Sequence, residues 1–144
     1  IINVASMAGI IAAPGMCAYS TSKFALIGFS QSLAAELDGR VDVSVVCPTF
    51  VRTNIAKNTI MQSPCASRRE KAVQSMQAFL EKIGSSPKKV SEIIMRTMLD
   101  RKRVVLVNPD AHVLYYLKKF LPGFSQSLIS RAYLKMLKKG VIQK

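Results

Sequence analysis

The chain has 144 residues, 49% of them hydrophobic, and 21 Lys and Arg residues against eight Asp and Glu give it a formal net charge of +13. This length and composition suit one globular α/β domain or a large part of one, and no apolar run reaches the ~18 residues of a transmembrane helix. Cys17, Cys47 and Cys65 have neither paired nor metal-ligand spacing, and the only histidine, His112, lies far from them. The sequence therefore predicts a cytoplasmic protein with reduced thiols and no metal site.

The first part of the chain predicts two buried strands joined by a helix. Residues 1–6 are apolar and β-branched and end in small side chains, which is typical of the end of a buried strand. The turn signal Pro14-Gly15 precedes a helix over 19–37, which Asp38-Gly39 ends, and residues 41–47 form the second strand. The helix repeats apolar or small residues at helical spacing, namely Phe24, Ile27, Gly28, Ser32, Leu33 and Leu37.

Tyr19 and Lys23 are the first candidate site residues. They lie four positions apart, about 6 Å of helical rise, so both side chains leave the same helix face. A cation about 5 Å from a phenol, at an effective dielectric of ~20, could lower the phenol pKa from its usual ~10 by roughly 2 units. The pair therefore indicates general acid–base chemistry near neutral pH, although a solvated helix face also carries this spacing.

An ordered set of motifs gives these residues a context. It comprises Ser6 at a strand end, Tyr19-Ser20-Thr21-Ser22-Lys23 on a helix, then Ser32, Leu33 and Glu36, and finally Pro48, Val51 and Thr53 after the next strand. Over about residues 1–107 this set resembles the short-chain dehydrogenase/reductase family. The chain departs from the family pattern at Thr49, where a Gly more often follows the proline.

The resemblance implies an α/β fold in which residues 1–108 are the C-terminal part of a doubly wound parallel-sheet (Rossmann-like) domain. It also implies an oxidoreductase that uses NAD or NADP to interconvert an alcohol and a carbonyl by hydride transfer. In such an enzyme Tyr19 passes the proton, Ser6 holds the substrate oxygen, and Lys23 lowers the pKa of the phenol and binds the nicotinamide ribose. The implied cofactor contacts come from Tyr19, Lys23, Pro48, Val51 and Thr53.

Other parts of the family pattern are not found in these residues. No glycine-rich strand–turn–helix is present to hold a pyrophosphate, and Asn3 lies on a strand and does not replace the Asn of the family's proton relay. The residue that selects NAD or NADP is also not found. We therefore expect the chain to be the C-terminal part of a longer, homo-oligomeric enzyme and to be inactive alone.

The rest of the chain carries most of the charge, with 17 Lys and Arg and five Asp and Glu over residues 61–144. Residues 49–64 predict a loop over a substrate pocket or a plain connector, and a basic helix starts near Ser67. A second helix runs from Pro87 to about Arg101, and 104–107 read as a last buried strand. The predicted buried stripe of that second helix is Val90, Ile93, Ile94, Thr97 and Met98.

Residues 109–144 predict a basic helical extension. Asp110 can cap a helix whose apolar positions are Val113, Leu114, Leu117, Phe120 and Leu121. A final helix from about Ser125 has Arg131, Lys135, Lys138 and Lys139 opposite an apolar stripe of Ile129, Tyr133, Met136 and Leu137.

Two interpretations of this extension stay open. Residues 124–139 can bind an anionic membrane surface, which would make the protein peripheral, or they can pack on the substrate pocket or a partner subunit. Basic residues interleaved with aliphatic ones argue against nucleic-acid binding. The apolar extension favours a hydrophobic alcohol or ketone as substrate. The alternative function is a non-catalytic membrane- or partner-binding module that retains the fold, but such a module does not need Ser6, Tyr19 and Lys23 together.

Overall fold

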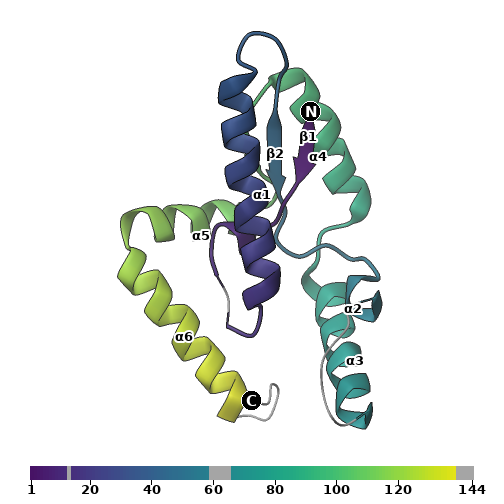
Figure 1. Ribbon diagram of the computed structural model, residues 1–144. Helices are drawn as coiled ribbons and strands as arrows, with labels where there is room; N and C mark the ends of the chain where they lie inside the picture. Colours follow the sequence, from purple (N-terminus) through teal and green to yellow (C-terminus); the bar gives the residue numbers. More distant parts are fainter. Residues whose placement is uncertain (13, 59–65, 139–144) are drawn as a thin grey trace.

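The computed structural model describes residues 1–12, 14–58 and 66–138, with the side chains of 66–69 and 136–138 excepted. Within these residues the chain forms a small parallel sheet surrounded by helices (Figure 1). The elements in chain order are β1 (Ile2–Val4), the 3₁₀ helix η1 (Met7–Gly9), α1 (Cys17–Glu36), β2 (Ser44–Cys47), α2 (Ile55–Asn58), α3 (Ala66–Ile83), α4 (Pro87–Asp100), β3 (Val104–Leu106), α5 (Pro109–Phe120) and α6 (Pro122–Lys138).

The sheet has the order β1-β2-β3, and both strand pairs are parallel. Asn3 pairs with Val45, and Val46 pairs with Val105. Parallel neighbours require crossover connections, which α1 supplies between β1 and β2 and the helices α2 to α4 supply between β2 and β3. The predicted α/β fold with a parallel sheet is thus confirmed.

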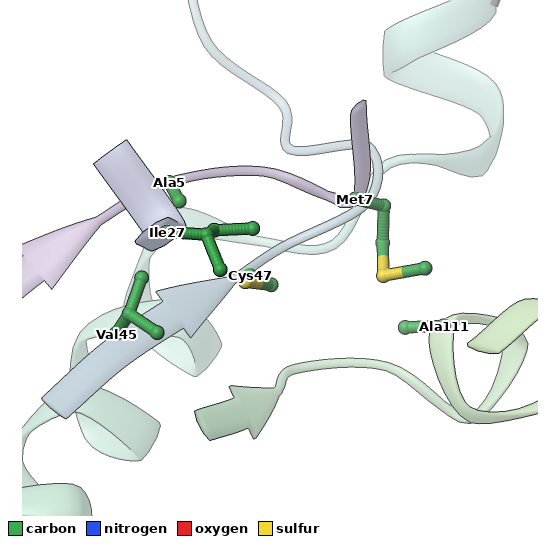
Figure 2. Packing of buried hydrophobic residues seen from close by; sticks show 6 residues of the cluster. All are labelled: Ala5, Met7, Ile27, Val45, Cys47 and Ala111. Atoms are coloured by element: carbon green, nitrogen blue, oxygen red, sulfur yellow. The ribbon is translucent and has the colours of Figure 1, made fainter. Parts of the chain in front are cut away.

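The core lies on both faces of β2, because successive side chains of a strand point to opposite faces. Val45 and Cys47 pack with Ile27 of α1, and Val46 packs with Val90 of α4. Figure 2 shows the first of these clusters, in which Met7 of η1 points toward Ala111 of α5. On one face of the sheet, the segment after β1 thus packs together with α1 and α5.

The second strand is shorter than predicted. The expected strand covered 41–47, but β2 contains only Ser44–Cys47. The backbone N–H of Val41 donates to the Leu37 carbonyl, which closes the turn after α1. The Asp42 carbonyl accepts from the backbone nitrogen of Ile1. These residues are therefore engaged at the end of the strand rather than in its ladder.

The buried face of α1 differs from the predicted stripe. Ile27 is buried as expected, but Phe24, Gly28 and Ser32 are exposed. The helix buries Ser20, Ser30 and Ala34 beside Ile27, so most of the side chains on its buried face are small. The Ser30 hydroxyl accepts from Asn3 Nδ2 at 2.9 Å and donates to the Leu26 carbonyl, so its polar group is satisfied.

Between β2 and β3 the helices begin close to where the sequence places them. Ser86 caps α4 with its side chain, Pro87 occupies the first turn, and Arg101 ends the helix in the left-handed conformation with φ 52°. Met98 of the predicted buried stripe is exposed. The last strand ends at Leu106 and lies at the sheet edge, where it is only partly buried. Within the predicted loop 49–64 the structure has α2, and residues 59–64, like Cys65, lie outside the described part.

The C-terminal extension forms two helices, as predicted, with different boundaries and faces. Asn108 rather than Asp110 is the N-cap of α5, since Pro109 already occupies the first turn. Ala111 and Tyr115 pack on the core, whereas Val113, Phe120 and Leu121 of the predicted stripe are exposed. The last helix starts at Pro122 instead of Ser125. Over the described ranges, every helix is too short or too polar to cross a membrane.

Candidate active site

Ser6 lies at the carboxyl end of β1, where parallel α/β sheets place their ligands. The residue is the N-cap of η1, and its backbone is extended. Its hydroxyl oxygen accepts a hydrogen bond from the Ala8 N–H at 3.1 Å, and the residue is 7% exposed. A serine hydroxyl that accepts one bond keeps its own hydrogen for a second partner. Ser6 can therefore still donate to a substrate oxygen.

Tyr19 and Lys23 meet on one face of α1, as their spacing predicts. The Lys23 Nζ lies 5.6 Å from the centre of the Tyr19 ring. The same ammonium donates to the Val4 carbonyl at 3.2 Å. Since Val4 ends β1 two residues before Ser6, Lys23 joins the helix of the phenol to the strand end of the serine. The structure thus connects two candidate residues directly and the third through the backbone of β1.

Gly9 allows this close approach of η1 to α1. A Cβ atom at position 9 would lie 2.6 Å from the Lys23 carbonyl oxygen and 2.7 Å from the Ile27 Cδ1. The Ile27 methyl group is the end of a flexible side chain, but the Lys23 carbonyl belongs to the helix backbone. Only glycine therefore fits between the segment after Ser6 and the helix that carries Tyr19.

Replacing Gly9 with Ala should push η1 away from α1. Overpacking of this kind typically costs about 1–3 kcal/mol, so we expect Gly9→Ala to lower the free energy of unfolding in urea by that amount. Gly28→Ala on α1 is the control, because a Cβ at position 28 meets nothing within 4 Å. Alanine should raise stability at that position by roughly 0.5–1 kcal/mol. Equal stability of Gly9→Ala and the wild type would contradict the account.

A buried polar network anchors the turn that follows β2. Asn108 Nδ2 donates to the Thr49 Oγ1 at 2.6 Å, and its Oδ1 accepts from the Ser85 hydroxyl at 2.7 Å. Asn108 is 7% exposed. Thr49, which departs from the family pattern, is therefore held in this turn by the hydrogen bond that its hydroxyl accepts from Asn108. Sequence reasoning missed Ser85 and Asn108 as supports of this turn, and only the position of Asn108 after a strand could have pointed to it.

The three predicted cofactor residues of this turn have different surroundings. Pro48 is buried, and its carbonyl accepts from the Met7 N–H at 2.9 Å, which ties the turn to η1. Val51 forms an isolated parallel bridge with Ser85. Thr53 is exposed, and its Oγ1 accepts from the Ile55 N–H at 3.4 Å. Pro48 and Val51 are thus fixed beside the strand ends, while Thr53 faces solvent.

Cys47 is a buried group beside the candidate residues that sequence reasoning did not assign to the site. Burial raises the pKa of the Cys47 thiol to about 11, although the Ser6 backbone and the Lys23 charge lower it. The thiol packs with Ile27 and Met7. It therefore serves as a small apolar side chain beneath Ser6.

The raised pKa of Cys47 predicts a loss of stability at high pH. Because the pKa rises from 9.0 to about 11 on folding, the stabilising effect is present below pH 9 and disappears as the pH rises to about 11. The difference in unfolding free energy between the wild type and Cys47→Ala should therefore shrink by roughly 2–3 kcal/mol over that range. Urea unfolding at a series of pH values measures it, and a constant difference would refute the assignment.

Lys118 of α5 holds the segment that connects Ser6 to Tyr19. Its Nζ donates to the Ile10 carbonyl and lies 5.0 Å from the centre of the Phe24 ring. Ile10 itself packs against the core together with Tyr115. The C-terminal extension therefore supports the candidate site. The sequence alone leaves open whether the extension packs on this part of the chain.

Among the described residues, no group of three or more His, Cys, Asp or Glu side chains is arranged to hold a metal ion.

Comparison with known proteins identifies relatives of this chain. Residues 1–63 match the family model "short chain dehydrogenase". The chain is 32% identical over 142 residues to "Probable oxidoreductase EphD" of Mycobacterium tuberculosis. The alignment covers 95% of this chain and 23% of that protein. It is 32% identical over 126 residues to mouse "Estradiol 17-beta-dehydrogenase 11", covering 85% of this chain and 36% of that protein.

A solved structure matches the fold as well. The short chain dehydrogenase/reductase from Burkholderia phymatum in complex with NAD superimposes with a TM-score of 0.69 at 25% identity, covering 83% of this chain and 46% of that one. The chain thus spans less than half the length of each of these proteins. Its parallel sheet and helices are part of a Rossmann-like domain, as the sequence predicts. On the agreement of the family model, the relatives and the solved fold, the chain belongs to the short-chain dehydrogenase/reductase family.

Proposed function

We propose that this protein supplies the proton-transfer half of an active site in an NAD(P)-dependent oxidoreductase that interconverts an alcohol and a carbonyl. The observation that carries the proposal is the position of the Lys23 ammonium. It lies 5.6 Å from the centre of the Tyr19 ring and 3.2 Å from the carbonyl of Val4, at the strand end that leads to Ser6. Lys23 thus contacts both the ring of Tyr19 and the strand end that leads to Ser6.

The donor set fits a nicotinamide cofactor. A lysine ammonium has three N–H donors, and the bond to Val4 uses one of them, so the others suit the hydroxyl groups of a ribose. Pro48 and Val51 belong to a turn anchored by Asn108. We propose that this turn and Thr53 contact the parts of the cofactor other than the ribose. The bound nicotinamide would supply or accept hydride at the substrate carbon.

The residues of the chain would then move the proton. In the direction of reduction, the Tyr19 phenol donates its proton to the carbonyl oxygen as that oxygen gains negative charge. Ser6 donates a hydrogen bond to the same oxygen and holds it in place. Lys23 contributes a positive charge beside the phenol. In the direction of oxidation Tyr19 takes the proton back from the alcohol.

We propose a hydrophobic alcohol or ketone as the substrate. The mouse relative is named a dehydrogenase of estradiol, which is a hydrophobic alcohol. The segment between Ser6 and Tyr19 contains Ile10 and Ile11, both only partly buried against the core, so apolar surface is available on the segment that connects these two residues.

Activity of the whole enzyme tests the proposal. Oxidation of a series of secondary alcohols with increasing apolar surface should be followed at 340 nm with NAD and with NADP. We expect turnover with one of the two cofactors and a kcat/KM that rises with apolar surface. No turnover with either cofactor in either direction would support the alternative, a non-catalytic module that retains the fold.

The 144-residue chain alone should be inactive. No glycine-rich turn that could hold a pyrophosphate occurs in its sequence, so the cofactor would keep only the contacts to its nicotinamide end. Titration with NADH and NADPH, followed by the fluorescence of the reduced nicotinamide, should therefore show no saturable tight site. Turnover by the isolated chain would contradict this expectation.

A further inference from the structure

The junction of α5 and α6 carries large apolar side chains on its surface. We call them the elbow surface: Tyr116, Phe120, Leu121, Phe124 and Leu128, which are 51%, 70%, 54%, 59% and 48% exposed. The rings of Tyr116 and Phe120 stack with their centres 6.1 Å apart. Figure 1 shows the junction projecting to the left, away from the sheet. Apolar side chains gathered in this way mark an interaction site.

The two helices already use their other faces within the chain. Ala111 and Tyr115 of α5 pack on the core, and Ser125 of α6 is buried. Of the apolar stripe predicted for the last helix, Ile129 and Tyr133 are half-buried, and Met136 and Leu137 lie outside the described side chains. Among the described side chains, the exposed apolar residues are therefore most numerous at the junction, and Leu134, which is 54% exposed, continues them along α6.

The charge around the elbow surface has one sign. From residue 111 to residue 144 the sequence has no Asp or Glu and seven cationic residues, which are Lys118, Lys119, Arg131, Lys135, Lys138, Lys139 and Lys144. Lys119 is exposed, and its Nζ lies 5.8 Å from the centre of the Phe120 ring. Arg131 and Lys135 are exposed on α6. A partner for this face must therefore offer both apolar groups and negative charge.

The other occupants fit less well. Further strands of a Rossmann-like sheet would add at the free edge of β1, which lies to the right of β2 in Figure 1, opposite the elbow. A second copy of the chain would bring the same cations against each other. Aromatic side chains flanked by lysines are instead typical of proteins that insert into the polar–apolar boundary of an anionic bilayer.

We propose that the elbow surface binds the surface of an anionic membrane, with Phe120 and Phe124 inserted among the acyl chains and Lys119, Arg131 and Lys135 facing the lipid phosphates. Because Lys118 of the same helix holds the Ile10 carbonyl beside the candidate site, membrane attachment would bring that site close to lipid-dissolved molecules.

A single tryptophan tests insertion. The chain has no Trp, so Phe120→Trp introduces one reporter at the elbow surface, and Leu99→Trp places one on α4, where the side chain is 82% exposed. On vesicles of phosphatidylcholine and phosphatidylserine, we expect a blue shift of emission for Phe120→Trp only. Phosphatidylcholine vesicles should give little shift. If Phe120→Trp alters the far-ultraviolet circular dichroism, Phe124→Trp is the second reporter.

Charge variants test the electrostatic part. In the Phe120→Trp background, Lys119→Gln, Arg131→Gln and Lys135→Gln together should weaken binding to the anionic vesicles roughly a hundredfold. The matched control changes three other exposed cations to Gln: Lys82, Lys88 and Lys89. It should weaken binding much less, and added salt should reduce the binding of the parent.

Three results would overturn the proposal. One is an absent shift, or an equal shift for the reporters at 120 and 99. Another is equal binding to neutral and anionic vesicles. The third is a blue shift without vesicles that grows with protein concentration, which would assign the elbow surface to a second copy of the chain.

Discussion

Replacing Tyr19 with Phe should lower the turnover of the whole enzyme at least about a hundredfold, because it removes the proton donor. The ring remains, so its contact with the Lys23 ammonium and its packing on α1 should persist. We therefore expect the melting temperature and the affinity for the cofactor to change little. Steady-state kinetics in both directions, with a thermal melt of each protein, measure the effect.

A tyrosine elsewhere provides the control for this substitution. Tyr133 is half-buried on α6, and Tyr133→Phe also removes one hydroxyl from a packed ring. It should leave turnover within about twofold of the wild type, since it lies outside the proposed acid–base chemistry. If Tyr19→Phe behaved like Tyr133→Phe, the proposed role of Tyr19 would be wrong.

Replacing Lys23 with Met should impair turnover and cofactor binding together. The substitution keeps an unbranched apolar stem but removes the charge beside Tyr19 and the bond to the Val4 carbonyl. Hydrogen bonds to charged groups contribute about 1.5–3 kcal/mol, so loss of a ribose contact should weaken cofactor binding by roughly tenfold to a hundredfold. Calorimetric titration with the cofactor, alongside kcat, separates the two effects.

Lys57→Met is the matched control, because Lys57 is an exposed lysine of α2. It should change neither the cofactor affinity nor kcat. If Lys23→Met reduced kcat but left the cofactor affinity unaltered, Lys23 would not bind the ribose. Its remaining role would be its position beside the phenol.

The sequence predicts those parts of the fold that depend on local patterns. The strands are apolar runs, and α4 begins at a capping serine followed by proline. The pairing of Tyr19 with Lys23 follows from their helical spacing alone. In each case the residues that determine the structure are neighbours in the chain.

The faces of the helices could not be predicted in the same way. An apolar repeat gives the period of a helix, but the buried side of α1 has three small residues beside Ile27, while bulky residues such as Phe24 and Phe29 are exposed. On α6 the repeat through Ile129 and Tyr133 is half-buried, while Phe124 is exposed. Which side is buried depends on how closely the backbones approach, and no single helix encodes that.

Polar contacts between residues far apart in the chain could not be predicted from the sequence either. The Asn108–Thr49 bond joins residues 59 positions apart, and the bond from Lys118 to Ile10 spans 108 positions. No periodicity connects such residues. Two further points stay predictions. One is the division of the chain into a domain over 1–108 and a tail over 109–144, and the other is the homo-oligomeric state.

A crystal structure of the whole enzyme with its nicotinamide cofactor and an unreactive ketone would show whether Ser6, Tyr19 and Lys23 form one active site. We expect the ketone oxygen to lie about 2.6–3.2 Å from both the Ser6 Oγ and the Tyr19 hydroxyl, and the Lys23 Nζ to contact the ribose. A ketone bound away from Tyr19, or a ribose without contact to Lys23, would contradict the assignment of these residues to one active site.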